Sequence, residues 1–184
     1  MKLVAWALGP AVRAEGPRRP DAASTAPTGL GVRVAAAVAG AALLAAGALH
    51  VVWTFSAWPL DSPDEFASTV VGVEESQLPS RPSTLAVALL LFLASWLVLT
   101  GARPAHRLAG SRLVRVGLWT VLGVMSIRGL GGMVVSGLAL GDAPAAFRHW
   151  DLLLYSPLCV VLGGLTGYVT ARTRRRRINP LGPA

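Results

Sequence analysis

The stretch VRVGLWTVLGVMSIRGLGGMVVSGLAL, residues 114–140, decides the fold. It is long enough to cross the hydrocarbon core of a bilayer, which takes about 20 helical residues. Polar and apolar residues do not alternate in it, so it lacks the pattern of a membrane strand. Its only charged residues are Arg115, near the start, and Arg128, in the middle. We therefore predict a membrane-spanning helix that carries one arginine at mid-depth.

Three more apolar segments accompany this one, at residues 34–55, 84–101 and 152–171. The 184-residue chain is 53% hydrophobic and 14% charged, an apolar excess that is typical of membrane proteins. The predicted fold class is therefore all-α, a bundle of four transmembrane helices over residues 32–171. Residues 1–31 are expected to form a disordered cytoplasmic tail, and residues 172–184 a basic cytoplasmic tail.

The distribution of charge predicts how the chain is threaded. Fourteen of the 17 Lys and Arg residues lie before the first apolar segment, between the second and the third or at the very start of the third, or after the fourth. Loops rich in Lys and Arg stay in the cytoplasm, so both termini are expected inside the cell membrane. The loops at about 56–83 and 141–151 then face outward. We interpret the run RTRRRR, residues 172–177, as a topology anchor beside the lipid bilayer, and we expect no nucleic-acid partner.

The loop between the first two segments contains DSPDEFASTVVG, residues 61–72. Ser62 suits the N-cap of a helix, Pro63 its first position and Glu65 its third position. This spacing predicts a capping box, in which the Ser62 and Glu65 side chains each accept a backbone hydrogen bond. We therefore predict a short helix from Pro63 to Val71 that lies over the outer mouth of the bundle.

Few polar side chains fall within the apolar segments, and they define a candidate site. Spacing by four residues places Asp151, Tyr155 and Cys159 on one helix face, and the first segment carries His50 and Trp53 near its outer end. Three of them have a simpler interpretation: His50 as a histidine bonded to a neighbour, Asp151 as a carboxylate that stabilises a helix dipole, and Cys159 as a small apolar side chain. A single cysteine forms no internal disulfide, and we expect no metal and no cofactor.

Arg128 is the most costly of these residues, because an arginine at the bilayer centre costs about 2.5–3.5 kcal/mol on insertion scales. It should therefore face the bundle. Gly131 and Gly132 are expected near the same side of the helix, where Gly132-x-x-x-Ser136 forms a small-xxx-small pattern. The fourth segment has a matching pattern, Gly163-x-x-x-Gly167. Such patterns let two helices approach closely, so the glycines beside Arg128 are expected to admit a neighbouring helix.

Three partners for Arg128 can be ranked from side-chain direction. Helical side chains lean toward the N-terminus of their own helix, which tilts Arg128 inward and Asp151 outward. The first-ranked partners are therefore the Leu153 carbonyl, freed by Pro157, and the Tyr155 hydroxyl. Asp151 ranks second and a bound anion third.

Four pieces of the chain carry a resemblance: GALHVVW (47–53), WPL (58–60), RGLGG (128–132) and FRHWDLLLYSPLC (147–159). Together they resemble domain-of-unknown-function family 3995, a family of small bacterial membrane proteins, over about residues 33–171. The resemblance implies four helices and an unassigned function. The matching positions are His50, Trp53, Arg128, Asp151, Tyr155, Pro157 and Cys159.

The leading hypothesis is a non-enzymatic integral membrane protein with a polar pocket near the outer leaflet. His50, Arg128, Asp151 and Tyr155 would frame this pocket, which either binds a small anionic or amphipathic ligand or joins the helices. One alternative is a membrane-embedded enzyme that acts on a lipid or quinone, with Arg128 as anion clamp. Another is an accessory subunit whose partner, or a second copy, covers the small-residue faces.

Overall fold

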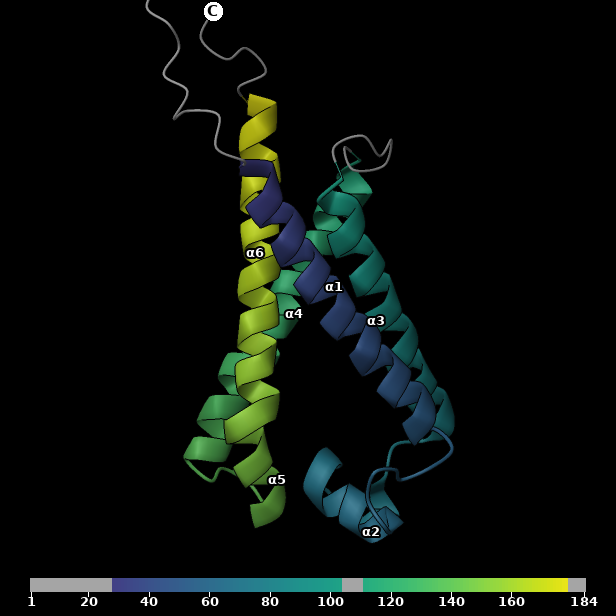
Figure 1. Cartoon of the computed structure of the whole chain (residues 1–184). Coiled ribbons are helices and arrows are strands. Elements are labelled where there is room, and N and C mark those ends of the chain that lie inside the picture. Colours follow the sequence, from purple (N-terminus) through teal and green to yellow (C-terminus); the bar gives the residue numbers. More distant parts are fainter. Residues whose placement is uncertain (1–27, 104–110, 179–184) are drawn as a thin grey trace, which may run out of the picture.

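The computed structural model describes residues 28–103 and 111–178, and within these ranges the chain forms helices and no strand. The long helices are α1 (Thr28–Trp53), α3 (Arg81–Gly101), α4 (Arg112–Gly137) and α6 (Ser156–Ile178). Two short helices, α2 (Pro63–Phe66) and α5 (Ala145–Trp150), lie together at one end of the bundle (Figure 1). We call this the distal end, and the end where the described chain starts and stops the proximal end.

The predicted all-α bundle of four membrane-length helices is confirmed. Within the described residues, four helical stretches are long and apolar enough to cross a membrane: Gly29–Trp53, Arg81–Gly101, Arg112–Gly137 and Ala145–Thr173. The protein is accordingly a multi-pass membrane protein.

The fourth stretch begins seven residues before the predicted start at residue 152. In it α5, a π-helical turn η5 (Asp151–Tyr155) and α6 follow one another without a break. Asp151 therefore lies within the helical stretch, six residues after its start, rather than at its N-terminus.

The helix ends also differ from the expected tails. Because α1 begins at Thr28, the last four residues of the stretch expected to be a tail are helical, and residues 1–27 lie outside the described residues. At the other end α6 continues to Ile178, well into the segment 172–184 that was expected to be a tail.

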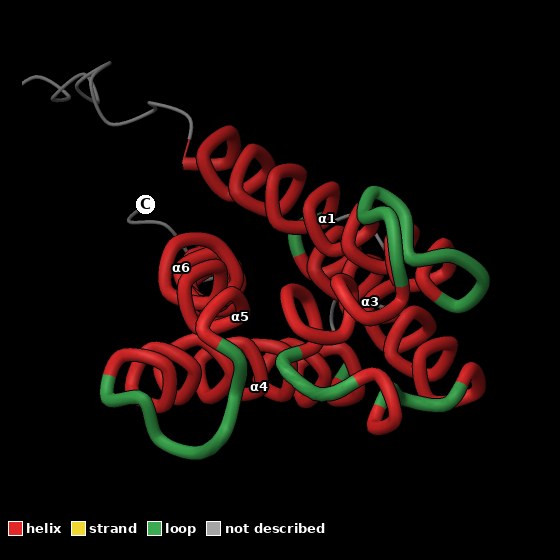
Figure 2. Tube along the Cα trace, turned by 90° about the horizontal axis from the view of Figure 1, so that it is seen from below, coloured by secondary structure: helices red, strands yellow, loops and turns green. Residues whose placement is uncertain are grey.

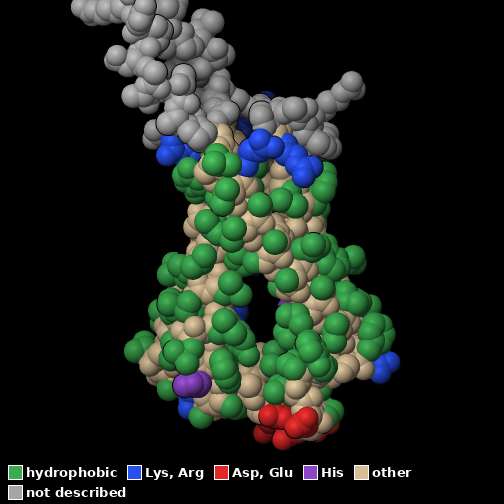
Figure 3. All heavy atoms as spheres, viewed as in Figure 1, with side chains coloured by type: hydrophobic (Ala, Val, Ile, Leu, Met, Phe, Trp, Pro, Cys, Tyr) green, Lys and Arg blue, Asp and Glu red, His purple; other side chains and the backbone are tan. Residues whose placement is uncertain are grey.

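The long helices pack as two pairs, α1 with α3 and α4 with α6. Figure 2, seen from the distal end, has α5 and α6 on one side and α1 and α3 on the other. The pairs meet in the proximal half, where the apolar core lies; its most buried members are Ala36, Ala39, Leu43, Val98 and Val169. In the distal half the pairs diverge, and Figure 3 shows an opening through the molecule between them. A basic side chain and a histidine are visible on its walls.

The predicted helix over the distal end is confirmed, with one difference in its cap. It consists of α2 and a π-helical turn η2 (Ala67–Val71), and it ends at Gly72, whose φ of 83° suits glycine. The Ser62 hydroxyl accepts a hydrogen bond from the Glu65 amide at 3.1 Å, as expected. The reciprocal half of the capping box was wrong: the Glu65 carboxylate accepts from the Asp61 amide at 3.3 Å, one residue before the N-cap.

This distal segment, residues 62–72, contacts both helix pairs. Phe66 packs against Trp53 of α1, with 5.4 Å between ring centroids. Gly72 lies against the ring of Phe147 in α5. A Cβ on Gly72 would meet that ring at 2.7 Å, so the contact is close. The segment therefore closes the distal end of the opening between the pairs.

The exposed acidic side chains gather at the distal end of the bundle, and most of the exposed arginines at the proximal end. Figure 3 shows arginine side chains gathered at the proximal end, and acidic side chains together with a few separate basic ones at the distal end. The exposed acids of the distal loop are Asp61, Asp64, Glu65, Glu74 and Glu75, and the exposed proximal arginines include Arg33, Arg103, Arg112, Arg115 and Arg172. This is the charge distribution from which the threading was predicted.

Candidate functional site

Helices α4 and α6 approach closely at the glycines beside Arg128. A Cβ on Gly129 would lie 2.8 Å from the Val160 amide nitrogen and 2.9 Å from the Ser156 carbonyl oxygen. Farther along α6, a Cβ on Gly163 would lie 3.1 Å from the Ser126 hydroxyl. Two of the three nearest atoms at Gly129 belong to the backbone of α6, which cannot rotate away, so no side chain fits at that position. These glycines admit the neighbouring helix, as the sequence predicted.

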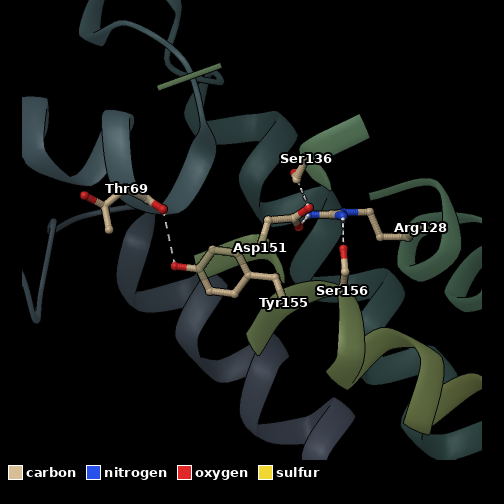
Figure 4. A network of polar contacts seen from close by, with 6 residues as sticks. All are labelled: Thr69, Arg128, Ser136, Asp151, Tyr155 and Ser156. Carbon is tan, nitrogen blue, oxygen red and sulfur yellow. Dashed lines mark hydrogen bonds and ion pairs between the residues drawn. The ribbon is translucent and has the colours of Figure 1, made fainter. Parts of the chain in front are cut away.

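The Arg128 guanidinium forms an ion pair with Asp151 across this contact (Figure 4). Its Nη2 donates to Asp151 Oδ1 at 2.8 Å, and its Nη1 donates to the Ser156 hydroxyl at 3.3 Å. The Ser136 hydroxyl donates to the other carboxylate oxygen, Asp151 Oδ2, at 2.6 Å. These hydrogen bonds join four residues into a single network, which we call the Arg128 network: Arg128 and Ser136 of α4, Asp151 of η5 and Ser156 of α6.

The ranking of partners for Arg128 was therefore wrong, since Asp151 is its closest polar partner. The reason is Gly132, one turn after Arg128 on α4. A Cβ on Gly132 would collide with Arg128 Nη1 and with Ser156 Oγ, and would lie 2.9 Å from Asp151 Oδ2. The guanidinium thus lies over the bare backbone of Gly132 and extends toward the C-terminus of α4, against the usual direction. Gly131, expected on the same side as Gly132, has no neighbour within 4 Å of such a Cβ and faces away.

The π-helical turn at Asp151–Tyr155 completes the network. In an α-helix, the side chains of residues i and i+5 point in different directions. In a π-helix the backbone hydrogen bonds join residues i and i+5, so these two residues lie nearly one above the other. The Ser156 amide donates to the Asp151 carbonyl in this pattern. Asp151 and Ser156 consequently both reach Arg128. The turn ends two residues before Pro157, whose missing N–H already interrupts the α-helical ladder.

The two charged partners differ sharply in burial. The Asp151 side chain is 1% exposed, and both of its oxygens accept hydrogen bonds. The Arg128 side chain is 43% exposed. A guanidinium carries five N–H donors, and the hydrogen bonds described here use one on each of two nitrogens. The carboxylate of Asp151 is therefore buried within the network, whereas part of the Arg128 side chain stays exposed.

Tyr155 points away from Arg128 (Figure 4). Its hydroxyl donates to the Thr69 carbonyl of the distal segment at 3.4 Å. Tyr155 was expected among the first partners of Arg128, and that expectation was wrong. It instead connects the fourth spanning helix to the segment that closes the distal end.

His50 and Trp53 form a separate aromatic cluster with Phe66. The His50 and Trp53 rings lie 5.0 Å apart, and His50 Nδ1 donates to the Ala46 carbonyl at 2.8 Å. Trp53 Nε1 donates to the Trp58 carbonyl at 2.8 Å. The contacts of His50 therefore match its simpler interpretation, a histidine bonded to a neighbour, and lie outside the Arg128 network.

Cys159 is a free, half-buried thiol on α6. Among residues 28–103 and 111–178, no three His, Cys, Asp or Glu side chains gather in a way that could hold a metal ion.

Ser156 and Thr69 were not predicted as site residues, and Ser136 was noted only as a small residue. A signal for Ser136 was present, because Arg128, Gly132 and Ser136 follow one another at intervals of four. Ser156 had no comparable signal, since it joins Asp151 only through the π-helical turn.

One family model matches the chain, over residues 43–166, with the description "Protein of unknown function (DUF3995)". No curated protein and no solved structure matches it. The matched range covers well over half of the chain and contains every residue of the Arg128 network. It also contains the aromatic cluster and Cys159. The chain therefore belongs to the DUF3995 family of proteins of unknown function.

Proposed function

We propose that this protein is a non-enzymatic membrane protein that binds an amphipathic ligand in the opening between its two helix pairs. Arg128 donates hydrogen bonds to the head of this ligand, and Asp151 holds Arg128 in place. The apolar part of the ligand lies between the helices.

The observation that carries this proposal is the unequal burial of the ion pair. A pair that serves only to join helices is most favourable when both partners are enclosed, because a half-enclosed charge in hydrocarbon is costly. Here Asp151 is enclosed, whereas Arg128 is 43% exposed and has donors left over. A ligand that accepts those hydrogen bonds would remove the cost.

The face of α4 that carries Arg128 supports the same proposal. Gly117 lies against Leu97 of α3, and Val121 belongs to the buried core. Steps of four and seven residues place Gly117, Val121 and Arg128 on one stripe of the helix. In the proximal half this stripe contacts the other helix pair. We infer that in the distal half, where the pairs diverge, the same stripe faces the opening, on whose wall Figure 3 shows a basic side chain.

We further propose that the protein lies in the cell membrane with both termini in the cytoplasm, so that the distal end and the ligand face outward. The basic proximal end and the acidic distal segment support this orientation.

The test is native mass spectrometry of the whole chain extracted in a mild detergent. The unaltered protein should retain a small hydrophobic molecule in stoichiometric amount. The double variant Arg128→Met, Asp151→Asn, which removes both charges together, should retain much less. Arg115→Met, at the exposed proximal end, is the matched control and should retain as much as the unaltered protein. Equal retention by all three proteins, or none by any, would contradict the proposal.

A further inference from the structure

We infer that the head of the ligand at Arg128 is a neutral hydrogen-bond acceptor, a carbonyl group on a long apolar chain, and not an anion. This inference rests on the proposed function and specifies its ligand. It follows from the charge, the burial and the hydrogen bonds of the Arg128 network.

The charge of the site is already balanced. Arg128 carries one positive charge at any accessible pH. Asp151 faces it at 2.8 Å and accepts a second, uncharged hydrogen bond from Ser136. An anionic head would bring a second negative charge to Arg128 in a medium of low dielectric constant, where like charges repel strongly. A carbonyl oxygen satisfies the open N–H donors without adding charge.

A cationic head is excluded by the burial of Asp151. The carboxylate is 1% exposed, and its two oxygens are occupied by Arg128 and Ser136. Ser156 is fully buried and accepts a hydrogen bond from Arg128. The open part of the network therefore consists of guanidinium donors, which require an acceptor.

The surroundings call for an apolar chain on this head. On α6, Cys159 continues the stripe of Leu162 and Val169, both buried in the core. The Tyr155 hydroxyl and His50 Nδ1 are already bonded to backbone carbonyls. The other arginines of the described spanning helices lie toward the helix ends: Arg33, Arg81, Arg112, Arg115, Arg148 and Arg172. A long hydrocarbon chain matches such walls better than a polar molecule does.

Two classes of membrane-resident compound share this chemistry, the ester of an acylglycerol and the ring carbonyl of an isoprenoid quinone. Both present a neutral carbonyl oxygen on a long chain. A set of probes with long apolar chains and different head groups tests which head group Arg128 prefers, and whether the carbonyl belongs to an ester or to a quinone. The probes are methyl palmitate, palmitate at alkaline pH, hexadecane, and a benzoquinone with an alkyl chain.

The experiment measures binding of each probe to the delipidated whole protein by native mass spectrometry. Methyl palmitate or the quinone should bind about tenfold or more tightly than palmitate, a difference of about 1.4 kcal/mol. Hexadecane should bind more weakly than either carbonyl probe. Preference for the ester assigns an acylglycerol, and preference for the quinone assigns a quinone. Tighter binding of palmitate would overturn the inference while leaving the proposed function in place.

A charge variant provides the second arm. Asp151→Asn leaves Arg128 uncompensated, so this variant should reverse the order and favour palmitate over methyl palmitate. The unaltered protein tests the inference by itself if this variant does not fold. An unchanged order in a folded Asp151→Asn protein would contradict the charge-balance argument. Absence of binding by every probe would overturn the inference and the proposed function together.

Discussion

Replacing Gly132 with alanine should damage the bundle, whereas the same replacement at Gly131 should not. The added Cβ at position 132 would overlap Arg128 Nη1 and Ser156 Oγ and lie 2.9 Å from Asp151 Oδ2. All three groups belong to the Arg128 network and would have to move. At Gly131 the added Cβ would have no neighbour within 4 Å.

The expected magnitude combines three effects. Overpacking of a close contact costs about 1–3 kcal/mol. Interhelical hydrogen bonds in membranes are worth about 0.6 kcal/mol on average, so their loss adds to the cost. Alanine has a higher helix propensity than glycine, which offsets up to about 1 kcal/mol of this cost. Gly132→Ala should therefore lower the free energy of unfolding by about 1–3 kcal/mol, and Gly131→Ala should leave it unchanged or raise it slightly.

The assay is reversible unfolding by sodium dodecyl sulfate in mixed micelles, followed by the loss of helical circular dichroism. The two variants differ by the same atoms at neighbouring positions, so each controls for the other. If they unfold alike, the guanidinium does not lie over Gly132 and the explanation for the ion pair fails.

Three more perturbations test other parts of the structure. Gly129→Ala should lower the free energy of unfolding by more than Gly132→Ala, because the added carbon meets backbone atoms of α6 that cannot rotate away. Gly123→Ala is the control and should be harmless, since nothing lies within 4 Å of its Cβ. Equal effects of Gly129→Ala and Gly123→Ala in the same assay would contradict the close helix contact. Ser62→Ala should lower the stability of the distal segment by about 0.5–2 kcal/mol through loss of the N-cap. The loss should be visible as faster amide hydrogen exchange in that segment, and unchanged exchange would contradict a stabilising role of the cap. A reporter enzyme that is active only outside the cytoplasm should be active when fused at Ala67 and silent at Ala105, and the reverse result would invert the proposed orientation.

The four spanning helices could be predicted from the sequence because hydrocarbon imposes a strong constraint on composition. Every backbone polar group in a lipid-facing segment must be satisfied within its own helix, which requires long apolar runs. Such runs are visible without any knowledge of packing. The N-cap at Ser62 was equally accessible, since a cap depends on residues only three apart.

The start of the fourth helix was less accessible. Residues 145–150 contain Arg148 and His149, so their composition resembles a loop, although they form α5 and lead directly into the spanning helix. The π-helical turn that follows contacts α4 and ends two residues before Pro157, and sequence periodicity does not report such a turn. These two features moved Asp151 into the reach of Arg128.

The direction of the Arg128 side chain was also missed for a local reason. The general rule that helical side chains lean toward the N-terminus assumes that the next turn carries side chains of its own. At Gly132 it carries none. The glycines were correctly interpreted as a close approach of helices, and the same absence of side chains also provides the space for the guanidinium.

The most direct test of the account is a double-mutant cycle between Arg128 and Asp151. The free energy of unfolding is measured for the unaltered protein, Arg128→Met, Asp151→Asn and the double variant in the micelle assay. Because each single variant leaves one unpaired group inside the bundle, the double variant should be less destabilised than the sum of the two. The account predicts a coupling energy of about 1 kcal/mol or more. A coupling energy near zero would contradict the ion pair on which the site and its proposed ligand depend.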